Sequence, residues 1–374
     1  MNTTKWILGL LAVVGISVFL YTLTAHVPGD TEAGPIKVGF VGPLTGDTAS
    51  IGTIARSAAE LAAEEINAEG GINGRQLQMI YEDGQCSTQA GSNAGNKLIN
   101  ADKVTAIIGG ACSTETAAFA PSAMQNKIVV IAYCSSAPSL SSTGAYFFRD
   151  YPSDAYQGKF AAEYAYNTLG ARKVAVVYHI SDWGTGIRDV FEKHFRELGG
   201  EIVADEGTQQ TDRDYRTALS KIKAAGPDLI YAPLYAEGGT VMLKQAKEIG
   251  LAIKFLGGDA WGDLKLQKDI ATLGGDVRYI ESEVPESDTF KAKLTAKTGG
   301  NTVPLCAPQT YDAVKILANA LKEAGTDPDK LAAAVRSTKY DGVSGHVEFD
   351  RNGDKTEATY VVKKIAGGTA APIQ

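Results

Sequence analysis

The fold is decided by the stretch Lys37-Val38-Gly39-Phe40-Val41-Gly42-Pro43-Leu44-Thr45-Gly46, which precedes a long helical pattern and then Asn67-Ala68-Glu69-Gly70-Gly71-Ile72-Asn73-Gly74-Arg75. Its apolar run at 36–41 predicts a parallel strand buried on both faces, and the Gly, Pro and Thr residues after it predict a turn before a helix. Such a loop opens at the carboxyl end of its strand, where helix N-termini present unpaired N–H donors. We therefore expect a binding crevice there.

Length and composition are those of a soluble globular chain of about two domains. The 374 residues are 44% hydrophobic and 21% charged, which is an ordinary globular profile. The 36 basic and 43 acidic residues leave a net charge of −7 without a basic tract. This balance argues against nucleic acid or an anionic membrane as a partner.

The first residues have the pattern of an export signal. Lys5 precedes an apolar segment at 6–25, which predicts a secretory signal peptide or a single membrane anchor within residues 1–33. Cleavage after Ala25 and cleavage after Ala33 are both open, and Thr31-Glu32-Ala33 fits the small-residue rule better. We expect an exported protein that stays anchored to the membrane only if this segment is not cleaved.

The four cysteines are interpreted in the light of export. Cys86, Cys112, Cys134 and Cys306 form no C-x-x-C pair, so disulfides are favoured over zinc or redox sites. Cys86 and Cys112 each follow a predicted strand, and adjacent parallel strands bring these ends together. A bond between them stabilises the fold by about 3 kcal/mol in the chain-entropy model. Whether Cys134 and Cys306 pair or remain free thiols stays open.

Strand and helix signals alternate along the chain, which predicts an α/β fold with parallel sheets. The predicted strands are 36–41, 77–81, 105–108, 128–132, 174–178, 201–205, 228–232, 253–257 and 277–280. The predicted helices are 53–67, 89–101, 116–126, 154–169, 185–198, 214–225, 239–249 and 307–324.

Two seams divide these elements into two lobes of similar layout. One seam lies near Tyr151-Pro152-Ser153-Asp154 and the other near Glu283-Val284-Pro285-Glu286. We expect a first lobe of residues 34–152 plus 284–342 and a second lobe of residues 153–283 plus 343–374. A ligand between two such lobes faces the strand ends of both.

Several motifs stand in order along the chain: 42–46, Gly52, Ala58, 67–75, Asp83-Gly84-Gln85-Cys86, Gly109-Gly110-Ala111-Cys112-Ser113 and Phe148-Arg149-Asp150. Together they resemble the leucine/isoleucine/valine-binding protein family, the periplasmic solute-binding proteins of ABC transporters. The similarity runs from about Ile36 to the C-terminus, and 67–75 is its most specific part. The resemblance implies two Rossmann-like, doubly wound lobes of a type I periplasmic binding protein, joined by a three-crossover hinge that closes over the ligand. It also implies the Cys86–Cys112 disulfide.

In the first lobe the resemblance assigns three serines to the ligand. Ser113 matches the serine that holds the ligand carboxylate, and a hydroxyl beside the N–H groups of a helix start suits that role. Ser135 and Ser136 match positions that contact the amine and the carboxylate. The alternatives are a helix N-cap for Ser113 and ordinary turn chemistry for the other two.

In the second lobe it assigns Asp259, Tyr235 and Trp183. Asp259 matches the acidic residue that pairs with the ligand ammonium, although glutamate is common there in the family; its alternative is a helix cap. Tyr235 and Trp183 match aromatic residues that cover the ligand, with core packing as the alternative. Ile51 stands in the first lobe where an aromatic residue often lines the side-chain pocket.

Other chemistry lacks its motif. The first strand is not followed by G-x-G-x-x-G, and Asp350-Arg351-Asn352-Gly353-Asp354 has its glycine too early for a calcium loop, so we expect a hairpin turn there. We predict a periplasmic, monomeric, non-enzymatic binding protein without cofactor or metal. It captures an amino acid, branched-chain-like or a related small amide or carboxylate, and delivers it to the permease of an ABC transporter. A ligand-sensing ectodomain of the same fold that feeds a receptor is the alternative.

Overall fold

The computed structural model describes residues 34–300 and 302–373. The predicted signal or anchor segment, 1–33, lies outside the described residues. In the part that is described, no helix is both long and apolar enough to cross a membrane.

The first sheet has five parallel strands in the order β2-β1-β3-β4-β5. These strands are β1 (Ile36–Gly42), β2 (Leu77–Asp83), β3 (Ala106–Gly109), β4 (Val129–Ala132) and β5 (Phe147–Arg149). β1 pairs with both β2 and β3, and Val38 is in register with Met79 and Ala106. The opening stretch of the sequence is therefore a central, buried strand, as its apolar run predicts.

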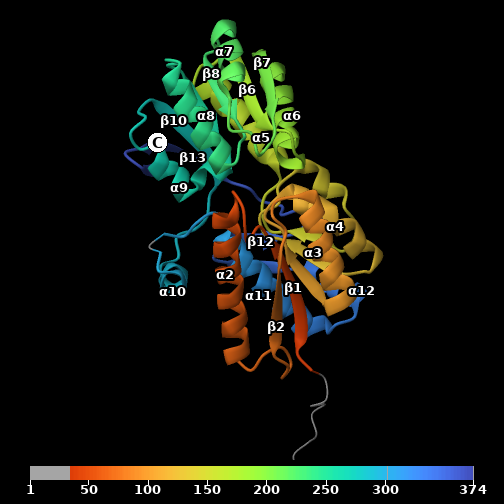
Figure 1. Ribbon diagram of the computed structural model, residues 1–374. Coiled ribbons are helices and arrows are strands. Elements are labelled where there is room, and N and C mark those ends of the chain that lie inside the picture. Colours follow the sequence, from red (N-terminus) through yellow and green to blue (C-terminus); the bar gives the residue numbers. More distant parts are fainter. Residues whose placement is uncertain (1–33, 301, 374) are drawn as a thin grey trace, which may run out of the picture. The chain divides into compact units, whose positions relative to one another are not determined.

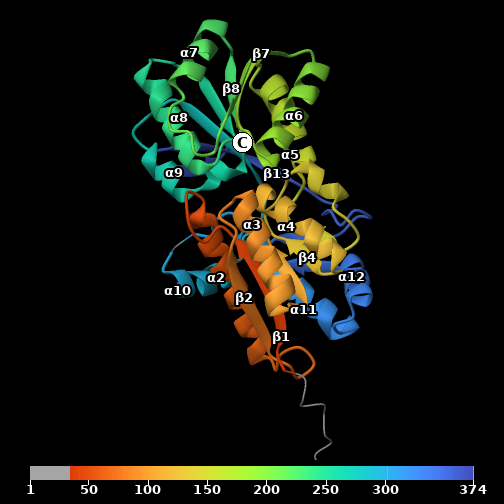
Figure 2. The same cartoon turned by 45° about the vertical axis from the view of Figure 1, so that its right-hand side comes forward.

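Helices cover both faces of this sheet. One face packs on α2 (Ala49–Ala68), α11 (Ala307–Ala324) and α12 (Pro328–Arg336). In Figure 1 the blue α11 lies beside the red-orange α2, although the two helices are far apart in the sequence. The other face packs on α3 (Thr88–Asn96), its π-helical extension Lys97–Asp102 and α4 (Ser113–Gln125). Figure 2 shows α3 and α4 side by side.

The second sheet has the order β14-β13-β10-β9-β8-β6-β7. Its parallel strands are β6 (Lys173–His179), β7 (Glu201–Thr208), β8 (Leu229–Ala232), β9 (Lys254–Gly257) and β10 (Asp276–Ser282). The antiparallel strands β13 (Tyr360–Ala366) and β14 (Thr369–Pro372) complete it. The predicted parallel order therefore holds except at this one edge.

The second sheet is also covered on both faces. Its first face packs on α7 (Arg216–Ala225), α8 (Ala236–Glu248) and α9 (Leu264–Asp269). Its second face packs on α5 (Asp154–Glu163), the π-helical turn Tyr164–Thr168 and α6 (Asp182–Glu197). Both sheets are thus doubly wound, which confirms the predicted fold class.

The chain passes between the two sheets three times. The first crossing lies between β5 and α5, and the second lies between β10 and α10 (Asp288–Thr298). The third leads from the hairpin of β11 (Lys339–Gly342) and β12 (Gly345–Glu348) to β13. Within that hairpin β12 pairs with β11, and Val347 and Phe349 pack in the core of the first sheet. The domain ranges remain a prediction, and this hairpin spans the boundary that the sequence places after residue 342.

The elements expected from the sequence differ from the structure mainly in length. The nine predicted strands coincide with β1 to β4 and β6 to β10. The predicted helix 307–324 has the bounds of α11. β5 escaped prediction because it has only three residues. The hairpin and the strands β13 and β14 also escaped it. Residues 350–354 do form a turn, because Gly353 N–H donates to the carbonyl of Asp350.

All four cysteines, each of which lies in the described residues, are paired in the structure. Cys86 bonds to Cys112 and Cys134 bonds to Cys306. The first pairing is the one that the sequence favours, but its stated reason was wrong, because β1 lies between β2 and β3 and these two strands are not adjacent. The sequence left open whether Cys134 and Cys306 pair. Their disulfide joins the loop after β4 to the residue before α11.

Glu115 lies fully buried beside the first disulfide and organises the backbone around it. Its Oε1 accepts the N–H of Ala111 (2.9 Å) and of Cys112 (3.1 Å), and its Oε2 accepts the N–H of Cys86 (3.1 Å). Burial raises the pKa of Glu115 to about 7, although these N–H groups oppose the rise. One carboxylate thus ties the loop after β2 to the start of α4.

We expect the unreduced, denatured protein to contain no free thiol and the reduced protein to contain four, because both pairs are bonded. Titration with a thiol reagent in denaturant measures this number. Two free thiols before reduction would show that Cys134 and Cys306 do not pair in solution.

We expect Glu115→Gln to lower the free energy of unfolding by about 1–3 kcal/mol at pH 8, because the amide nitrogen faces an N–H group that loses its acceptor. Chemical denaturation measures the change. Glu163→Gln, at a partly exposed position at the end of α5, is the matched control and should leave stability within about 0.5 kcal/mol of wild type. Equal effects of the two variants would contradict this role of Glu115.

Candidate functional site

The predicted ligand residues lie at the carboxyl ends of neighbouring strands. In the first lobe Ser113 follows β3, and Ser135 and Ser136 follow β4. In the second lobe three residues follow β6, β8 and β9, in that order: Trp183, Tyr235 and Asp259. All six are at least nine-tenths buried. Parallel strands deliver these loops to one edge of each sheet.

Trp183 and Tyr235 pack against the disulfide of the first lobe. Their rings stack with a centroid distance of 4.6 Å, and both belong to one buried cluster with Cys86, Cys112 and Ala260. The cluster joins residues from both lobes, so core packing within one lobe does not account for the two aromatic rings. They lie where they can cover a ligand held at the start of α4.

The serines of the first lobe are linked to one another through the backbone. Ser113 is the first residue of α4, with Cys112 at the cap position, so the N-cap interpretation of Ser113 was wrong. Its Oγ accepts the N–H of Ala137 at 3.0 Å, which leaves its own proton to donate. The Ser135 hydroxyl donates to the carbonyl of Gly110 at 2.9 Å and contacts Thr116 Oγ1 at 2.6 Å. Ser135 therefore holds two loops together.

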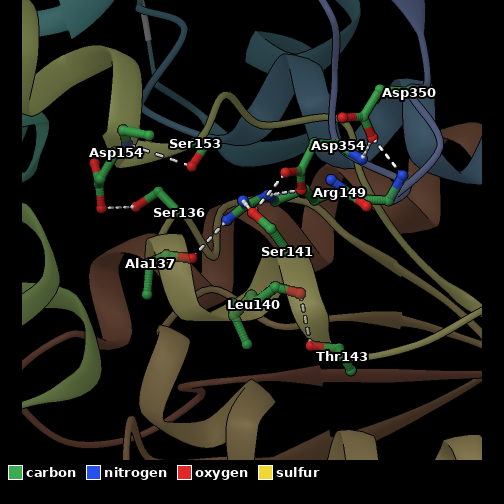
Figure 3. Close-up of polar contacts among 12 residues, drawn as sticks. Ser136, Ala137, Leu140, Ser141, Thr143, Arg149, Ser153, Asp154, Asp350 and Asp354 are labelled. Carbon is green, nitrogen blue, oxygen red and sulfur yellow. Dashed lines mark hydrogen bonds and ion pairs between the residues drawn. The ribbon is translucent and has the colours of Figure 1, made fainter.

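Two buried aspartates meet beside these serines. Ser136 donates its hydroxyl proton to Asp154 Oδ2 at 2.7 Å, as Figure 3 shows, while Asp154 Oδ1 is buried without a hydrogen-bond partner. Asp259 Oδ2 accepts the hydroxyl proton of Tyr151 at 2.7 Å, and its Oδ1 accepts the N–H of Ala260 at 2.8 Å. The N–H of Asp259 reaches Gln157 Oε1 at 3.3 Å.

Burial raises the pKa of both carboxyl groups. For Asp154 the pKa lies well above the ordinary value, because burial is strengthened by repulsion from Asp259. For Asp259 burial is again the first cause of the raised pKa, and the hydroxyl of Tyr151 opposes it. Neither carboxyl group forms a salt bridge in the described residues. A cation between them would stabilise their ionised forms.

Sequence reasoning missed part of this arrangement. It placed Tyr151 and Asp154 at a seam between the lobes and assigned none of Tyr151, Asp154 and Gln157 to the ligand. In the structure all three surround Asp259. The signal that would have found them is their position directly after β5, a strand too short to be recognised from its pattern.

A separate buried ion pair holds the loop that carries Ser136. Arg149 Nε lies 2.6 Å from Asp354 Oδ1, and the same guanidinium donates to the carbonyl of Ala137 and to Ser141 Oγ, both at 2.8 Å (Figure 3). Arg149 is fully buried. Its charge forms an ion pair with Asp354, and from a greater distance it also lowers the pKa of Asp154, although burial and Asp259 outweigh this effect.

The rim of the site is bridged by contacts between the loop after β1 and the second lobe. Asp47 forms an ion pair with Arg213, and Ser50 donates to Asp263 Oδ2 at 2.8 Å. Ile51 is half-buried on the first turn of α2 and packs against the core of the first lobe. No contact described for Ile51 joins it to the Trp183–Tyr235 cluster, so its predicted role in the side-chain pocket stays a prediction.

A cavity of about 840 Å³ lies elsewhere, along the crossings between the sheets. It is lined by 281–288, 302–306, 308–309, 343–346, 357–359, Lys355 and Val361 among other residues, and of the polar residues described above only Tyr151 borders it. The site residues Ser113, Ser135, Ser136, Asp154, Asp259, Trp183 and Tyr235 are absent from its lining. The strand-end site is therefore the stronger candidate for ligand binding.

Known proteins share this architecture over nearly the whole chain. The family model described as "Periplasmic binding protein" matches residues 35–369. A leucine-, isoleucine-, valine-, threonine- and alanine-binding protein of Pseudomonas aeruginosa is 29% identical over 88% of this chain and 90% of its own. An amino acid binding protein of the same organism is 30% identical over 95% of this chain and 94% of its own.

Solved structures agree with the sequence relatives. The leucine-binding protein LivK from Thermotoga maritima superposes with a TM-score of 0.85 at 26% identity, covering 91% of this chain and 98% of its own. LivJ from Streptococcus pneumoniae, in complex with isoleucine, gives a TM-score of 0.82 at 29% identity, covering 90% and 98%. With the match of the family model, these similarities show that the chain belongs to the periplasmic binding protein family.

Proposed function

We propose that this protein captures an amino acid between its two lobes and delivers it to the membrane permease of an ABC transporter. The observation that carries the proposal is the pair of buried carboxyl groups, Asp154 and Asp259, which lack a cationic partner in the described residues. A buried carboxylate without a partner is costly, and an ammonium group supplies both charge and hydrogen bonds. The amino-acid ligands of the relatives carry such a group.

The rest of the ligand backbone fits the first lobe. The start of α4 offers backbone N–H groups and the hydroxyl proton of Ser113, which are suited to a carboxylate. Ser136 lies between this helix start and Asp154. Trp183 and Tyr235 close over the ligand and exclude water, which strengthens the charged contacts. Closure then follows because the ligand binds the closed state more tightly than the open state.

Aromatic acids are the competing ligand class. A solute-binding protein of Rhodopseudomonas palustris that is 25% identical to this chain was solved with 3,4-dihydroxybenzoic acid. Such a ligand carries a carboxylate but no ammonium, so it leaves Asp154 and Asp259 without a counter-charge. The acidic pair therefore favours an amino acid over an aromatic acid.

The proposal includes binding without catalysis. The site combines charged, hydroxyl and aromatic groups that suit recognition, and the family to which the chain belongs consists of binding proteins. We propose that the protein acts in the periplasm as a monomer without cofactor, after export through the predicted segment 1–33. The permease then recognises the closed form.

We expect Asp259→Asn to weaken amino-acid binding at least about 30-fold, because one of the two charges that hold the ammonium is lost. Calorimetric titration with a panel of amino acids measures the affinity. Asp189→Asn, at an exposed position of α6, is the matched control. If Asp259→Asn bound as tightly as the control, the ammonium site would be misplaced.

We expect Ser113→Ala to weaken binding about three- to tenfold through the loss of one hydrogen bond to the ligand carboxylate. Ser122→Ala, on the same helix but with its hydroxyl donating to Asn96 rather than facing the site, should leave affinity unchanged. The ligand-induced rise of the melting temperature reports both effects. An unchanged rise in Ser113→Ala would remove this serine from the site.

We expect affinity to fall as pH falls, because the raised pKa values of Asp154 and Asp259 cause protons to compete with the ammonium. The sign follows from linkage. The ionised carboxylates bind the cation, so each proton that must leave weakens binding about tenfold per pH unit below the pKa. Titrations between pH 8 and pH 5 measure the slope, and Asp259→Asn should flatten it. A pH-independent affinity in the wild type would contradict the acidic pair.

A further inference from the structure

Two polar contacts at the rim of the site join the first lobe to the second. Asp47, in the loop between β1 and α2, forms an ion pair with Arg213, which lies between β7 and α7. Ser50, on the first turn of α2, donates its hydroxyl proton to Asp263 Oδ2 at 2.8 Å, and Asp263 directly precedes α9. Both contacts exist only when the two lobes lie together.

The loop that carries Asp47 is held in place by the first lobe itself. Asp83, the last residue of β2, accepts the N–H of Leu44 at 2.8 Å and the hydroxyl proton of Thr45 at 2.5 Å. These bonds fix the chain just before Asp47. Little ordering is then needed when Asp47 meets the second lobe, and a contact between groups that are already ordered contributes more.

The loop that carries Arg213 is held in the same way by the second lobe. The buried side chain of Gln245, on α8, donates to the carbonyl of Arg213 at 2.9 Å and accepts the N–H of Tyr215 at 2.6 Å. The guanidinium of Arg213 also donates to the carbonyl of Asp212 at 2.9 Å. Arg213 is thus directed by its own lobe toward the ion pair with Asp47.

Asp263 uses its two carboxylate oxygens for different partners. Its Oδ1 caps α9 by accepting the N–H of Lys265 at 2.8 Å and of Leu266 at 3.0 Å. Its Oδ2 accepts the proton of Ser50. Because the cap holds the carboxylate within the second lobe, Ser50 of the first lobe meets an acceptor whose orientation is already set.

We propose that these two contacts form a latch that holds the closed state together and sets the affinity for every ligand alike. The latch residues are Asp47, Ser50, Arg213 and Asp263. This inference rests on the proposed function, because the latch acts on the closure that encloses an amino acid. Among the hydrogen bonds and ion pairs of the described residues, none joins a latch residue to a side chain that we assign to the ligand. The latch therefore strengthens binding without selecting a ligand side chain.

The exposure of the latch determines the size of its effect. The side chains of Asp47 and Arg213 each keep 38% of their surface exposed, and an exposed ion pair changes an equilibrium constant by about two- to fivefold. The lobes must part before the ligand leaves, so loss of the latch speeds release and changes association little. Salt screens such an exposed pair more than it screens the buried contacts to the ligand.

The test uses L-leucine, L-alanine, L-threonine and L-glutamate as probes in calorimetric titration of the full chain. We expect Arg213→Gln to weaken each amino acid that the wild type binds by the same factor, about two- to fivefold. Stopped-flow tryptophan fluorescence should show an equal rise in the release rate of the most tightly bound probe. Asp47→Asn should have the same effect, and the double variant should be no weaker than either single one, because all three lack the same ion pair.

Arg216→Gln is the matched control. Its guanidinium pairs with Asp214 and Glu248, both within the second lobe, and its side chain is exposed. This variant should leave the affinity and the release rate unchanged. Raising sodium chloride from about 20 to about 500 mM should weaken binding in the wild type and in the control more than in Arg213→Gln.

The outcomes separate the latch from the proposed function. Unchanged affinity in both Arg213→Gln and Asp47→Asn overturns the latch and leaves the proposed function standing. A loss in Arg213→Gln that is confined to L-glutamate makes Arg213 a contact to the ligand side chain and also overturns the latch.

A wild type that binds no amino acid in the wider panel overturns the proposed function itself. The latch is then tested without a ligand, in the full chain that carries Asp47→Cys and Arg213→Cys. We expect a short bismaleimide to link these two cysteines, because the lobes meet at this rim, and mass spectrometry of a protease digest detects the link. The absence of this link would overturn the latch.

Discussion

The parallel course of the strands is the constraint on which the rest of the structure depends. Because parallel strands end at the same edge, each loop that follows a strand is delivered to one line at the carboxyl side of its sheet. Two sheets joined by three crossings bring two such lines together. Residues as distant in the sequence as Ser136 and Asp259 thereby reach Asp154 and its neighbours. Antiparallel pairing of the same strands would have scattered these loops over two edges.

Charge compensation distinguishes the buried charges that the fold satisfies from those that we propose for ligand binding. Arg149 is fully buried and meets Asp354, Ser141 and the carbonyl of Ala137, so its charge and its hydrogen bonds are used inside the protein. Glu115 accepts three backbone N–H groups and is likewise satisfied. Asp154 is as deeply buried, yet one of its oxygens has no partner. Satisfied charges of this kind stabilise a fold, and the unpaired oxygen of Asp154, beside Ser136 and Asp259, supports its proposed place in the binding site.

The fold was largely predictable from the sequence, and the site only in part. The apolar runs and helical periodicity of β1, α2 and α11 are local signals, and local signals determine the alternation that implies parallel sheets. Ser113 and Asp259 were found because their motifs resemble a known family. Asp154 was placed only at a seam between the lobes, because its significance depends on Asp259, which only the folded chain brings close.

In the proposed function, the acidic pair couples ligand binding to closure. Asp154 on α5 and Asp259 after β9 both belong to the second lobe, while Ser136 of the first lobe donates to Asp154, and Trp183 and Tyr235 pack on the Cys86–Cys112 disulfide. Burial raises the pKa of both carboxyl groups, which makes their ionised forms costly. A bound ammonium would offset this cost, and the first lobe completes its surroundings only when the lobes close. Because a ligand shifts a conformational equilibrium only by its difference in affinity for the two states, we propose that the acidic pair recognises the ligand and that contacts from the first lobe supply the free energy of closure.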